Sequence, residues 1–569
     1  AQHSKEVFKI FNHLEGKRDA HGGLGGMATM NFDGEVGRAV GDVEVGDLVS
    51  RYTAKVASFD SNSAQFDTTF RREVEVGVAA LNENWSAMGA PDDTTRDISI
   101  AEVASAQKYL TKKGKLFKAP GLDNVANWML VWGGHAVARL LLPMLRGTWA
   151  LGVMPAAWNK ALARYLYKGK GSKLEISNYR PISLLSTIAK FATVVWMPRV
   201  MRVLSPSLVV EQGCAKQGQG AQEHLWAFLS LAEDSIQGLD GEGEGLCALF
   251  ADVHKAYDQV WRDGLYLILY AQGLRGNLWQ LVQAWLGGAV ASTEWNGVQG
   301  PPVQLQQGVR QGCVLSPILY CTFINAFLAP VPNWEMPAPL QPLVTKVFSQ
   351  GLQGPGGRWG LYSPALKKRV AAMLYMDDTT LVAKSLPQLQ QIAERYVHFC
   401  RMFRIRINPT KSTIMVFSRS PTAAPVVHAE IAAGGMGFST PKSGTQRYLG
   451  AVMDARLSLG PTLDRAVAMA NSRGATLRAV AKRMGENMAL WYLTSKVEPA
   501  VLHNLELLQG WSAAQRDRLD RAMAGAVQEA LLCGPLSAWW REGQPRPNKV
   551  GSLLETPLLQ WSLQVDKRA

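Results

Sequence analysis

Apolar positions repeat with a helical period in two regions of the chain. Residues 99–112 begin with a capping pattern, Ser99 followed by Glu102, and continue with apolar residues at helical spacing. After a turn, an apolar segment that ends near residue 150 predicts a further helix. From about residue 462 the helical spacing returns, with basic residues between the apolar ones. Helical regions are therefore expected on both sides of a middle part that has a different pattern.

Two short apolar runs in this middle part predict buried strands, and both lead to acidic residues. The first run covers residues 246–252 and ends in Asp252. The second covers residues 370–378 and ends in Asp377 and Asp378. A carboxylate at the end of a buried strand costs free energy unless a cation or hydrogen bonds compensate it.

Acidic side chains from two adjacent strands suit the chemistry of phosphoryl transfer. They can hold two divalent cations about 4 Å apart, where one ion activates an attacking hydroxyl group and both stabilise the charge on the phosphate. Mg²⁺ fits such a set because it prefers oxygen ligands. The alternative is that Asp377-Asp378 is an ordinary hairpin turn whose acids face water, which is the usual explanation of an isolated acidic pair.

Segments rich in glycine and proline separate these regions. Residues 238–245 (GLDGEGEG) predict a flexible acidic turn before the first strand, and residues 329–360 predict an insertion or long loop. Residues 1–100, with a glycine-rich turn at 21–26, indicate loops and short helices without recognisable chemistry. The length of 569 residues suggests roughly three or four compact units.

The charge and the cysteines narrow the class of protein. With 60 Lys and Arg against 46 Asp and Glu, the formal charge is +14. This excess indicates a polyanionic partner, either nucleic acid or an acidic membrane. The alternative is that the positive charge only makes the protein more soluble. A membrane span is not expected, because the most apolar stretch, near residues 136–157, contains Arg139 and Arg146. The six cysteines lack a C-x-x-C spacing, so we expect reduced thiols in an intracellular protein without a zinc site.

Seven motifs follow one another across about residues 100–530. They are Lys118-Ala119-Pro120-Gly121, Asn178-Tyr179-Arg180-Pro181-Ile182-Ser183-Leu184-Leu185, Phe250-Ala251-Asp252 with Lys255-Ala256-Tyr257-Asp258, Gln307-Gly308-Val309-Arg310-Gln311-Gly312-Cys313-Val314-Leu315-Ser316-Pro317, Tyr375-Met376-Asp377-Asp378, Arg406-Ile407-Asn408-Pro409-Thr410-Lys411 and Tyr448-Leu449-Gly450. In this order they together resemble the motifs of the non-LTR (LINE-type) retrotransposon reverse transcriptases. Tyr-Met-Asp-Asp is less usual in this branch than Tyr-Ala-Asp-Asp, and residues 212–218 lack the Gly-Phe-Arg element of the family.

The resemblance implies an α+β right-hand polymerase, with fingers, a palm built on an antiparallel sheet, and an α-helical thumb. Its activity would be that of an RNA-directed DNA polymerase, which adds dNTPs to a primer 3′-end by two-metal phosphoryl transfer. The expected divisions are an N-terminal extension of unclear role (1–98), fingers (99–237), a palm (238–455) with a Pro/Gly-rich insertion (329–369), a thumb (456–535) and a C-terminal tail (536–569).

The same resemblance implies the metal ligands and the partners. Asp252 and Asp377 would bind two Mg²⁺ ions, with Mn²⁺ as an alternative, while Asp378 supports the site and the main-chain carbonyl of Val253 adds an oxygen. The expected partners are an RNA template, a DNA primer or target, and dNTPs, but no membrane. As a retroelement enzyme the protein would work in the nucleus and cytoplasm.

Five residues are expected to contact the incoming nucleotide. Tyr257 would pack under the sugar and exclude a 2′-hydroxyl, or else be an ordinary core tyrosine. Gln311 and Gly312 would line the pocket, although a structural glycine turn before a helix near Ser316 is compatible with this. Lys168 and Arg180 would hold the triphosphate. The alternative for both is a solvated surface charge, and Lys170 could replace Lys168.

Downstream residues would serve the leaving group and the duplex. Lys411 would protonate the departing pyrophosphate, unless it is only a loop residue, and Tyr448, Leu449 and Gly450 would steady the primer end. Basic residues on the C-terminal helices would follow a duplex backbone, although a solvated face explains any single helix equally well. These residues are Arg465, Arg473, Arg478, Lys482 and Arg483.

Two other functions are compatible with the core motifs. A group II intron-type reverse transcriptase would carry a basic maturase-like domain after the thumb, which the sequence does not indicate. A catalytically inactive, retroelement-derived RNA-binding scaffold would not need its acidic residues, yet Asp252, Asp377 and Asp378 are all present.

Overall fold

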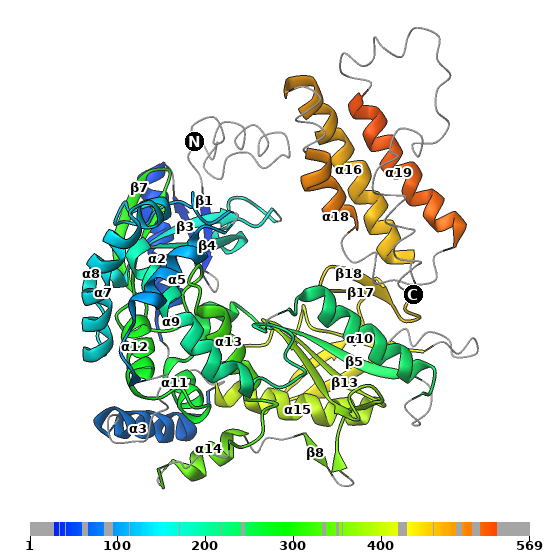
Figure 1. Cartoon of the computed structure of the whole chain (residues 1–569). Helices are drawn as coiled ribbons and strands as arrows, with labels where there is room; N and C mark the ends of the chain where they lie inside the picture. Colours follow the sequence, from blue (N-terminus) through cyan, green and yellow to red (C-terminus); the bar gives the residue numbers. More distant parts are fainter. Residues whose placement is uncertain are drawn as a thin grey trace.

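A computed structural model describes most of the chain as a mixed α/β protein (Figure 1). Most of the N-terminal helices, though not α3 (Thr68–Asn84), lie around a four-stranded sheet, a six-stranded sheet lies in the centre, and the C-terminal helices stand apart beyond a small hairpin (Figure 1). In the described part, no helix combines the length and the apolar character needed to cross a membrane. The described residues are 28–59, 66–84 and 95–531, apart from gaps at 33–34, 40, 113, 170, 217, 240–244, 333–336, 339, 349–351, 355–356, 419–428, 459, 485–491 and 503–511.

Two long helices near the N-terminus correct the expectation of loops and short helices. They are α2 (Asp42–Ala57) and α3 (Thr68–Asn84). Val45, Leu48 and Val49 of α2 are buried against the four-stranded sheet, so this helix belongs to the same packed layer. Both helices have apolar residues at helical spacing in the sequence, but the many polar residues between them make this spacing hard to recognise. The glycine-rich turn proposed at 21–26 lies outside the described residues.

The four-stranded sheet has the order β4-β3-β6-β7. It pairs β3 with β4 antiparallel and with β6 parallel, and α8 leads directly into β3. The elements are α8 (Ala156–Asn159), β3 (Lys160–Tyr167), β4 (Tyr179–Leu185), β6 (Val290–Trp295) and β7 (Val298–Gln304).

The predicted helix after Ser99 is confirmed as α5 (Ile100–Leu110), with a complete capping box. The Ser99 main-chain N–H donates to Glu102, and the Glu102 main-chain N–H donates to the Ser99 hydroxyl. The predicted apolar helix is α7 (Gly134–Leu151). Helices α6 (Asn127–Trp132) and α9 (Thr187–Leu204) belong to the same group of helices as α5 and α7.

The central sheet has the order β12-β13-β5-β14-β16-β15, and its first four strands are antiparallel. Strand β5 covers Leu246–Asp252, as predicted. Because successive side chains of a strand point to opposite faces, its residues divide between two apolar clusters. Leu249 and Ala251 join the cluster that includes α15, and Ala248 and Phe250 join the one that includes α10. The other elements are α10 (Ala221–Ile236), β12 (Ala372–Tyr375), β13 (Asp378–Ala383), α15 (Leu386–Met402), β14 (Thr413–Phe417), β15 (Glu430–Ala433) and β16 (Met436–Ser439).

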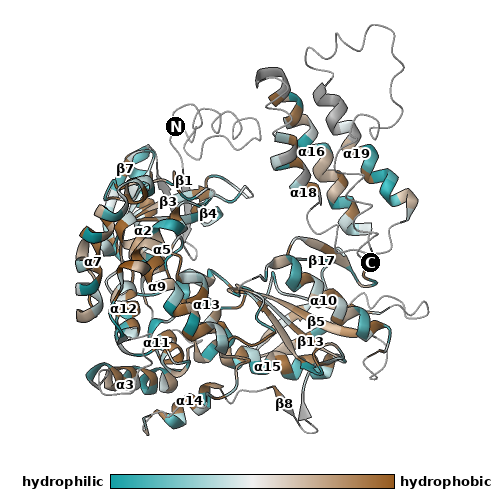
Figure 2. Cartoon of the chain, viewed as in Figure 1, coloured by the Kyte–Doolittle hydropathy of each residue, from teal (hydrophilic) through white to brown (hydrophobic). Residues whose placement is uncertain are grey.

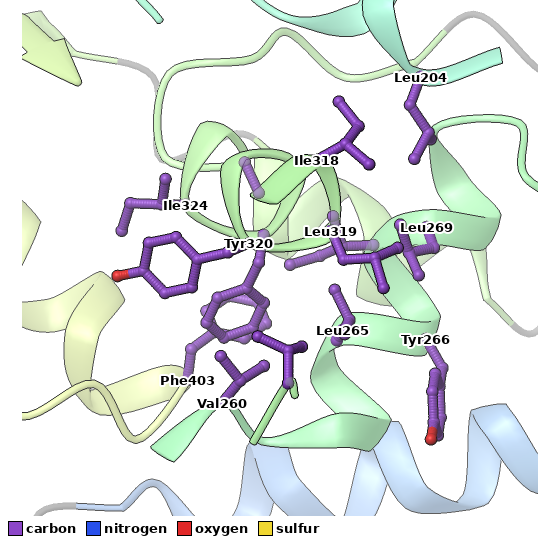
Figure 3. Close-up of a cluster of buried hydrophobic side chains, with 14 of the residues drawn as sticks. Leu204, Val260, Leu265, Tyr266, Leu269, Ile318, Leu319, Tyr320, Ile324 and Phe403 are labelled. Carbon is purple, nitrogen blue, oxygen red and sulfur yellow. The ribbon is translucent and has the colours of Figure 1, made fainter. Parts of the chain in front are cut away.

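Helix α13 (Ser316–Asn325), which begins where the sequence predicted, lies in the largest core. Its Leu319 and Tyr320 contact this core close to Leu265 of α11 (Arg262–Ala271) and Phe403 (Figure 3). Helix α12 (Gly276–Gly287) packs against α11 through the edge-on rings of Tyr270 and Trp279. Nearly every residue of α11 and α13 is buried, and hydrophobic residues are frequent along these helices (Figure 2).

The Pro/Gly-rich region was expected to be an insertion or long loop. It is not a long loop throughout, because it contains α14 (Gln341–Phe348). Leu343, Val344, Val347 and Phe348 are buried and join the largest core. Four apolar residues at helical spacing favour the helix. Pro342 is its second residue, a position at which proline is tolerated because no intrahelical hydrogen bond from its nitrogen is needed.

The C-terminal helices have a core of their own. Leu463 is buried, and Ala470, Leu477 and Val480 of α16 face this core as predicted. A hairpin precedes α16, and the Thr462 hydroxyl donates to the carbonyl oxygen of Val452 in that hairpin (2.7 Å). The side chains of Lys482 and Arg483, and the tail 536–569, lie outside the described residues. The elements are β17 (Thr445–Tyr448), β18 (Ala451–Asp454), α16 (Gly460–Met484), η4 (Leu493–Val497), α18 (Glu498–Leu502) and α19 (Ala513–Leu531).

The remaining elements are short and lie between the larger ones. They are β1 (Ala28–Phe32), β2 (Glu35–Ala39), η1 (Ile176–Asn178), η2 (Ser205–Ser207), η3 (Ala256–Gln259), β8 (Gln353–Gly354), β9 (Gly357–Arg358), β10 (Leu361–Ser363) and β11 (Lys368–Val370).

Candidate active site

The predicted acidic residues meet at one edge of the central sheet. Strand β5 pairs antiparallel with β13, and Asp252 is the direct partner of Asp378. Asp377 lies in the tight turn between β12 and β13, next to Met376, whose φ of 54° is left-handed. The two acidic ends, far apart in the chain, are therefore neighbours in the fold.

The segment around Asn408 fixes the end of β5. The Ser412 hydroxyl accepts a hydrogen bond from the main-chain N–H of Asp252 (3.0 Å), and the main-chain N–H of Asn408 donates to the Asp252 carbonyl oxygen (2.8 Å). The main-chain N–H of Lys411 donates to the Asn408 carbonyl oxygen (3.2 Å) and closes the turn. The predicted motif 406–411 thus positions the backbone of Asp252.

The carboxylates influence one another. Desolvation, and then the negative charges of Asp377 and Asp252, raise the pKa of Asp378 to about 6. Such repulsion is what a divalent cation relieves, and oxygen ligands are those that Mg²⁺ prefers, so this donor set fits a hard cation. The three carboxylates are not a complete ligand set, however, because within the described ranges no group of three or more His, Cys, Asp or Glu side chains is arranged to hold a metal ion; a bound cation would need further oxygen ligands.

Tyr257 lies beside the acidic turn. It belongs to η3, directly after Lys255, whose φ of 48° is left-handed. Its hydroxyl group is 3.3 Å from the sulfur of Met376, and its ring packs edge-on against Tyr320 with the centroids 5.1 Å apart. Burial first, and then nearby groups that include Asp377, raise the pKa of Tyr257 well above its usual range.

The motif at 307–317 connects the segment of Tyr257 with strand β4 of the four-stranded sheet. The main-chain N–H of Val309 donates to the Tyr257 carbonyl oxygen (2.8 Å), and that of Ser183 in β4 donates to the Gln311 carbonyl oxygen (3.2 Å). Gly312 has a φ of 105°, and a Cβ atom there would lie 2.9 Å from the Ser183 carbonyl oxygen. Glycine is therefore required for this close approach.

The side chain of Gln311 leads to a residue that the sequence did not single out. Its Nε2 donates to Oδ1 of Asp258, 2.9 Å away. Desolvation raises the pKa of Asp258 to about 6, although the Gln311 hydrogen bond and the charges of Lys255 and Lys168 act in the opposite direction. The only signal in the sequence was an acid at the end of Lys255-Ala256-Tyr257-Asp258, which alone does not distinguish a buried carboxylate from an exposed one.

The predicted triphosphate contacts lie on β4 and in the loop after β3. Arg180 is exposed on β4, opposite Leu166 of β3. The Nζ of Lys168 donates to the Ser177 carbonyl oxygen (2.7 Å). Lys170, the alternative to Lys168, lies outside the described residues.

Basic residues also gather around His254, directly after the β5 carboxylate. Desolvation, and then four positive charges, lower the pKa of His254 to about 4. The predicted Lys168 and Lys411 are two of these neighbours, and Lys255 and Arg406 are the two that sequence reasoning did not assign. The end of β5 therefore combines negative carboxylates with a basic surround, as a site for a phosphate and its cations requires.

The predicted primer hairpin is the turn between β17 and β18. Leu449 and Gly450 form this turn with φ values of 44° and 94°. Tyr448 is buried, and its ring packs against Phe250 and Phe228 with centroid distances of 5.2 and 5.4 Å. The hairpin is thereby attached to the strand that carries Asp252.

The comparisons with known proteins support a mixed α/β, polymerase-like fold. A family described as "Reverse transcriptase (RNA-dependent DNA polymerase)" matches residues 168–453. The chain belongs to this reverse transcriptase family, and its curated relatives assign it to the non-LTR retrotransposon branch. Members of the family generally use divalent metal ions.

Three curated relatives come from Drosophila melanogaster. The "Probable RNA-directed DNA polymerase from transposon BS" is 24% identical over 376 residues, which are 65% of this chain and 37% of that protein. The protein of transposon X-element is 25% identical, covering 60% of this chain and 34% of its own length. The protein of mobile element jockey is 23% identical, covering 62% and 35%. The chain thus spans about a third of the length of these relatives.

One solved structure among the matches is an apo telomerase from Candida tropicalis, truncated from its C-terminal domain. It has a TM-score of 0.33 and 11% sequence identity, and the match covers 57% of this chain and 60% of that one.

Proposed function

We propose that this chain is an RNA-directed DNA polymerase that adds dNTPs to the 3′-end of a primer annealed to an RNA template. The observation that carries the proposal is the direct pairing of Asp252 with Asp378 beside Asp377, with Tyr257 against the same turn. In the reaction the primer 3′-hydroxyl loses its proton to water and its oxygen bonds to the α-phosphorus of the dNTP. The bond from that phosphorus to the bridging oxygen of the β-phosphate breaks, and pyrophosphate leaves.

The acidic residues would hold the cations of the site. Asp252 and Asp377 would bind two Mg²⁺ ions together with the main-chain oxygen of Val253, and Asp378 would support them. When bound, these ions supply positive charge to the attacking oxygen and to the phosphate. The support for this assignment is the mutual repulsion of the three carboxylates, which leaves a negative site at the strand ends.

The other residues would bind the nucleotide and move the proton. Lys168 and Arg180 would hold the triphosphate, and Gln311 and Gly312 would line the pocket. Tyr257 would lie under the sugar, where its ring leaves no room for a 2′-hydroxyl. Lys411 would donate a proton to the departing pyrophosphate.

The same proposal assigns a role to each part of the chain. Residues 99–237 would act as fingers, 238–455 as the palm and 456–535 as a thumb. The thumb would follow the primer–template duplex through its basic residues, independent of sequence. Tyr448, Leu449 and Gly450 would steady the primer end. The protein would meet its RNA template and DNA target in the cytoplasm and the nucleus.

Primer extension tests the proposal directly. With a poly-A template, an oligo-dT primer, dTTP and Mg²⁺, the wild type is expected to extend, whereas Asp252→Asn and Asp377→Asn are not, despite unchanged RNA binding. Asp47→Asn, on the exposed face of α2, is the matched control and should extend normally. If all four proteins bind RNA and none extends, the chain is a binding scaffold and the proposal is wrong.

A further inference from the structure

Asp258 lies in a polar cluster formed by four separate parts of the chain. Its Oδ1 accepts the hydrogen bond from Nε2 of Gln311, and the positive charges of Lys255 and Lys168 act on its carboxyl group. Its negative charge is in turn one of the causes, after burial, that raise the pKa of Tyr52 in α2 to about 12. The carboxylate therefore faces groups from η3, from the loop after β3, from α2 and from the 307–317 motif.

The backbones on both sides of the Asp258–Gln311 hydrogen bond are fixed. The main-chain N–H of Gly308 donates to the Val260 carbonyl oxygen (2.8 Å), and a Cβ atom at Gly308 would lie 2.8 Å from the Asp258 carbonyl oxygen. Gln311 itself is held to β4 through Ser183 (3.2 Å). With both backbones held, the side-chain hydrogen bond determines how the Gln311 amide is oriented.

An ionised carboxylate can only accept hydrogen bonds, so it selects one of the two orientations of the amide. The NH₂ group of Gln311 must face Asp258, which leaves the amide oxygen free to accept from a ligand. A glutamine without this partner would present its oxygen and its nitrogen about equally. The orientation suits a donor on the nucleotide, such as a sugar hydroxyl.

Helix α2 lies beside the residues that surround Asp258. The ammonium group of Lys255 lies 4.6 Å from the ring centre of Tyr52, and the hydroxyl groups of Thr53 and Tyr165 are hydrogen-bonded (2.7 Å). The aromatic face holds the lysine in place without neutralising the charge of Asp258. Through α2, the N-terminal part of the chain thus contacts the residues that surround Asp258.

We propose that Asp258 is the positioning residue that orients the amide of Gln311 in the nucleotide pocket. This inference rests on the proposed function, which makes Gln311 a nucleotide contact. Asp258 does not touch the nucleotide and acts only through the glutamine.

The test measures dTTP binding and extension separately. The Kd for dTTP is measured on a template–primer whose primer ends in a dideoxynucleotide, so that binding does not depend on turnover; KM and kcat come from an extendable primer. Asp258→Leu and Gln311→Met are each expected to raise Kd and KM by about tenfold, the loss typical of one charged hydrogen bond. The kcat should change much less, and the double variant should bind no worse than either single one.

Two further variants separate positioning from a merely structural role. Asp258→Asn keeps an oxygen that can accept from Gln311 and should restore Kd to within about twofold of the wild type. Gln311→Glu places two acceptors together and should weaken binding, whereas Asp258→Asn combined with Gln311→Glu reverses donor and acceptor and should recover it. This pair keeps the test decisive if Asp258→Leu fails to fold.

The outcomes distinguish the inference from the proposed function. Unchanged Kd in Asp258→Leu, or multiplied effects in the double variant, would overturn the positioning role while extension by the wild type stands. A wild type that binds dTTP with the predicted pattern but never extends would support the positioning role and contradict the polymerase. A wild type that does not bind dTTP contradicts both.

Discussion

Asp252 and Asp378 are direct partners across the antiparallel strands β5 and β13. Side chains of directly opposed residues lie on the same face of a sheet, about 5 Å apart at Cβ, so the two carboxylates repel each other. Desolvation, then the charge of Asp377 and then this repulsion by Asp252 raise the pKa of Asp378 to about 6. The pairing gives the site its negative charge, and it also separates Asp378, on the strand, from Asp377, in the turn.

This difference in position predicts unequal effects of substitution. Asp378→Asn removes a supporting charge and should lower kcat for dTTP addition by about 10- to 100-fold, as losses outside the direct ligands do. Asp252→Asn should lower it by a thousandfold or more, which corresponds to about 4 kcal/mol. Single-turnover extension at saturating Mg²⁺ measures both, and equal losses would contradict the supporting role of Asp378.

The contact between Tyr257 and Met376 predicts how sugar discrimination should respond. Tyr257→Val removes the ring that lies beside the acidic turn, so the preference for dTTP over UTP should fall on the order of tenfold to a hundredfold. Tyr257→Phe is the matched control, because it loses the hydroxyl contact with Met376 but keeps the ring. Competition between the two nucleotides measures the ratio. If valine leaves it unchanged, Tyr257 is an ordinary core residue.

The sequence was sufficient where a local pattern determines the structure. The short apolar run 246–252 predicts a buried strand, and the structure confirms β5 with the same bounds. The capping box at Ser99 and the start of α13 at Ser316 were confirmed for the same reason. These features depend on neighbouring residues alone.

What the sequence could not provide depends on contacts between distant segments. Asp258 resembles any acid after a tyrosine until Gln311 is placed 2.9 Å from it. Helix α14 was not predicted, because prolines are frequent in its region of the sequence. Helix α2 was not recognised as a helix that packs on the four-stranded sheet. Tyr448 could be read as a primer contact from its motif, but only the fold places its ring in the core.

The left-handed backbone at Gly312 predicts that alanine is not tolerated there. A Cβ atom would add a contact of 2.9 Å with the Ser183 carbonyl oxygen to a φ of 105°. Gly312→Ala should therefore destabilise the protein by about 1–3 kcal/mol and raise KM for dTTP by displacing Gln311. Gly297→Ala is the control, because that glycine has a φ of 86° but nothing near its Cβ position. Equal losses in denaturant unfolding would show that the close approach to β4 is unimportant.

The ion pair of Arg199 with Glu102 predicts a pH-dependent stability in the N-terminal layer. The guanidinium group, fully buried, donates to both Glu102 oxygens at 2.8 Å. Desolvation opposes ionisation, yet the bonds from Arg199 and Ser99 prevail and lower the pKa of Glu102 to about 2. A carboxylate with a lowered pKa in the folded state stabilises the protein above its ordinary pKa, and this stabilisation is lost as the pH falls towards the folded value.

Glu102→Gln should therefore lower the free energy of unfolding at pH 7 by about 2–3 kcal/mol, because the buried Arg199 charge loses its carboxylate partner and keeps only neutral acceptors such as the carbonyl oxygens of Arg96 and Asp97. The difference from the wild type should shrink as the pH falls from about 4.5 towards 2, because the wild-type carboxylate is then protonated as well. Glu73→Gln breaks the exposed pair with Lys346 (3.2 Å) and should cost less than about 1 kcal/mol at any pH. Urea unfolding followed at several pH values measures these differences. A gap between the wild type and Glu102→Gln that stays constant down to low pH would mean that the carboxylate is not held ionised by Arg199.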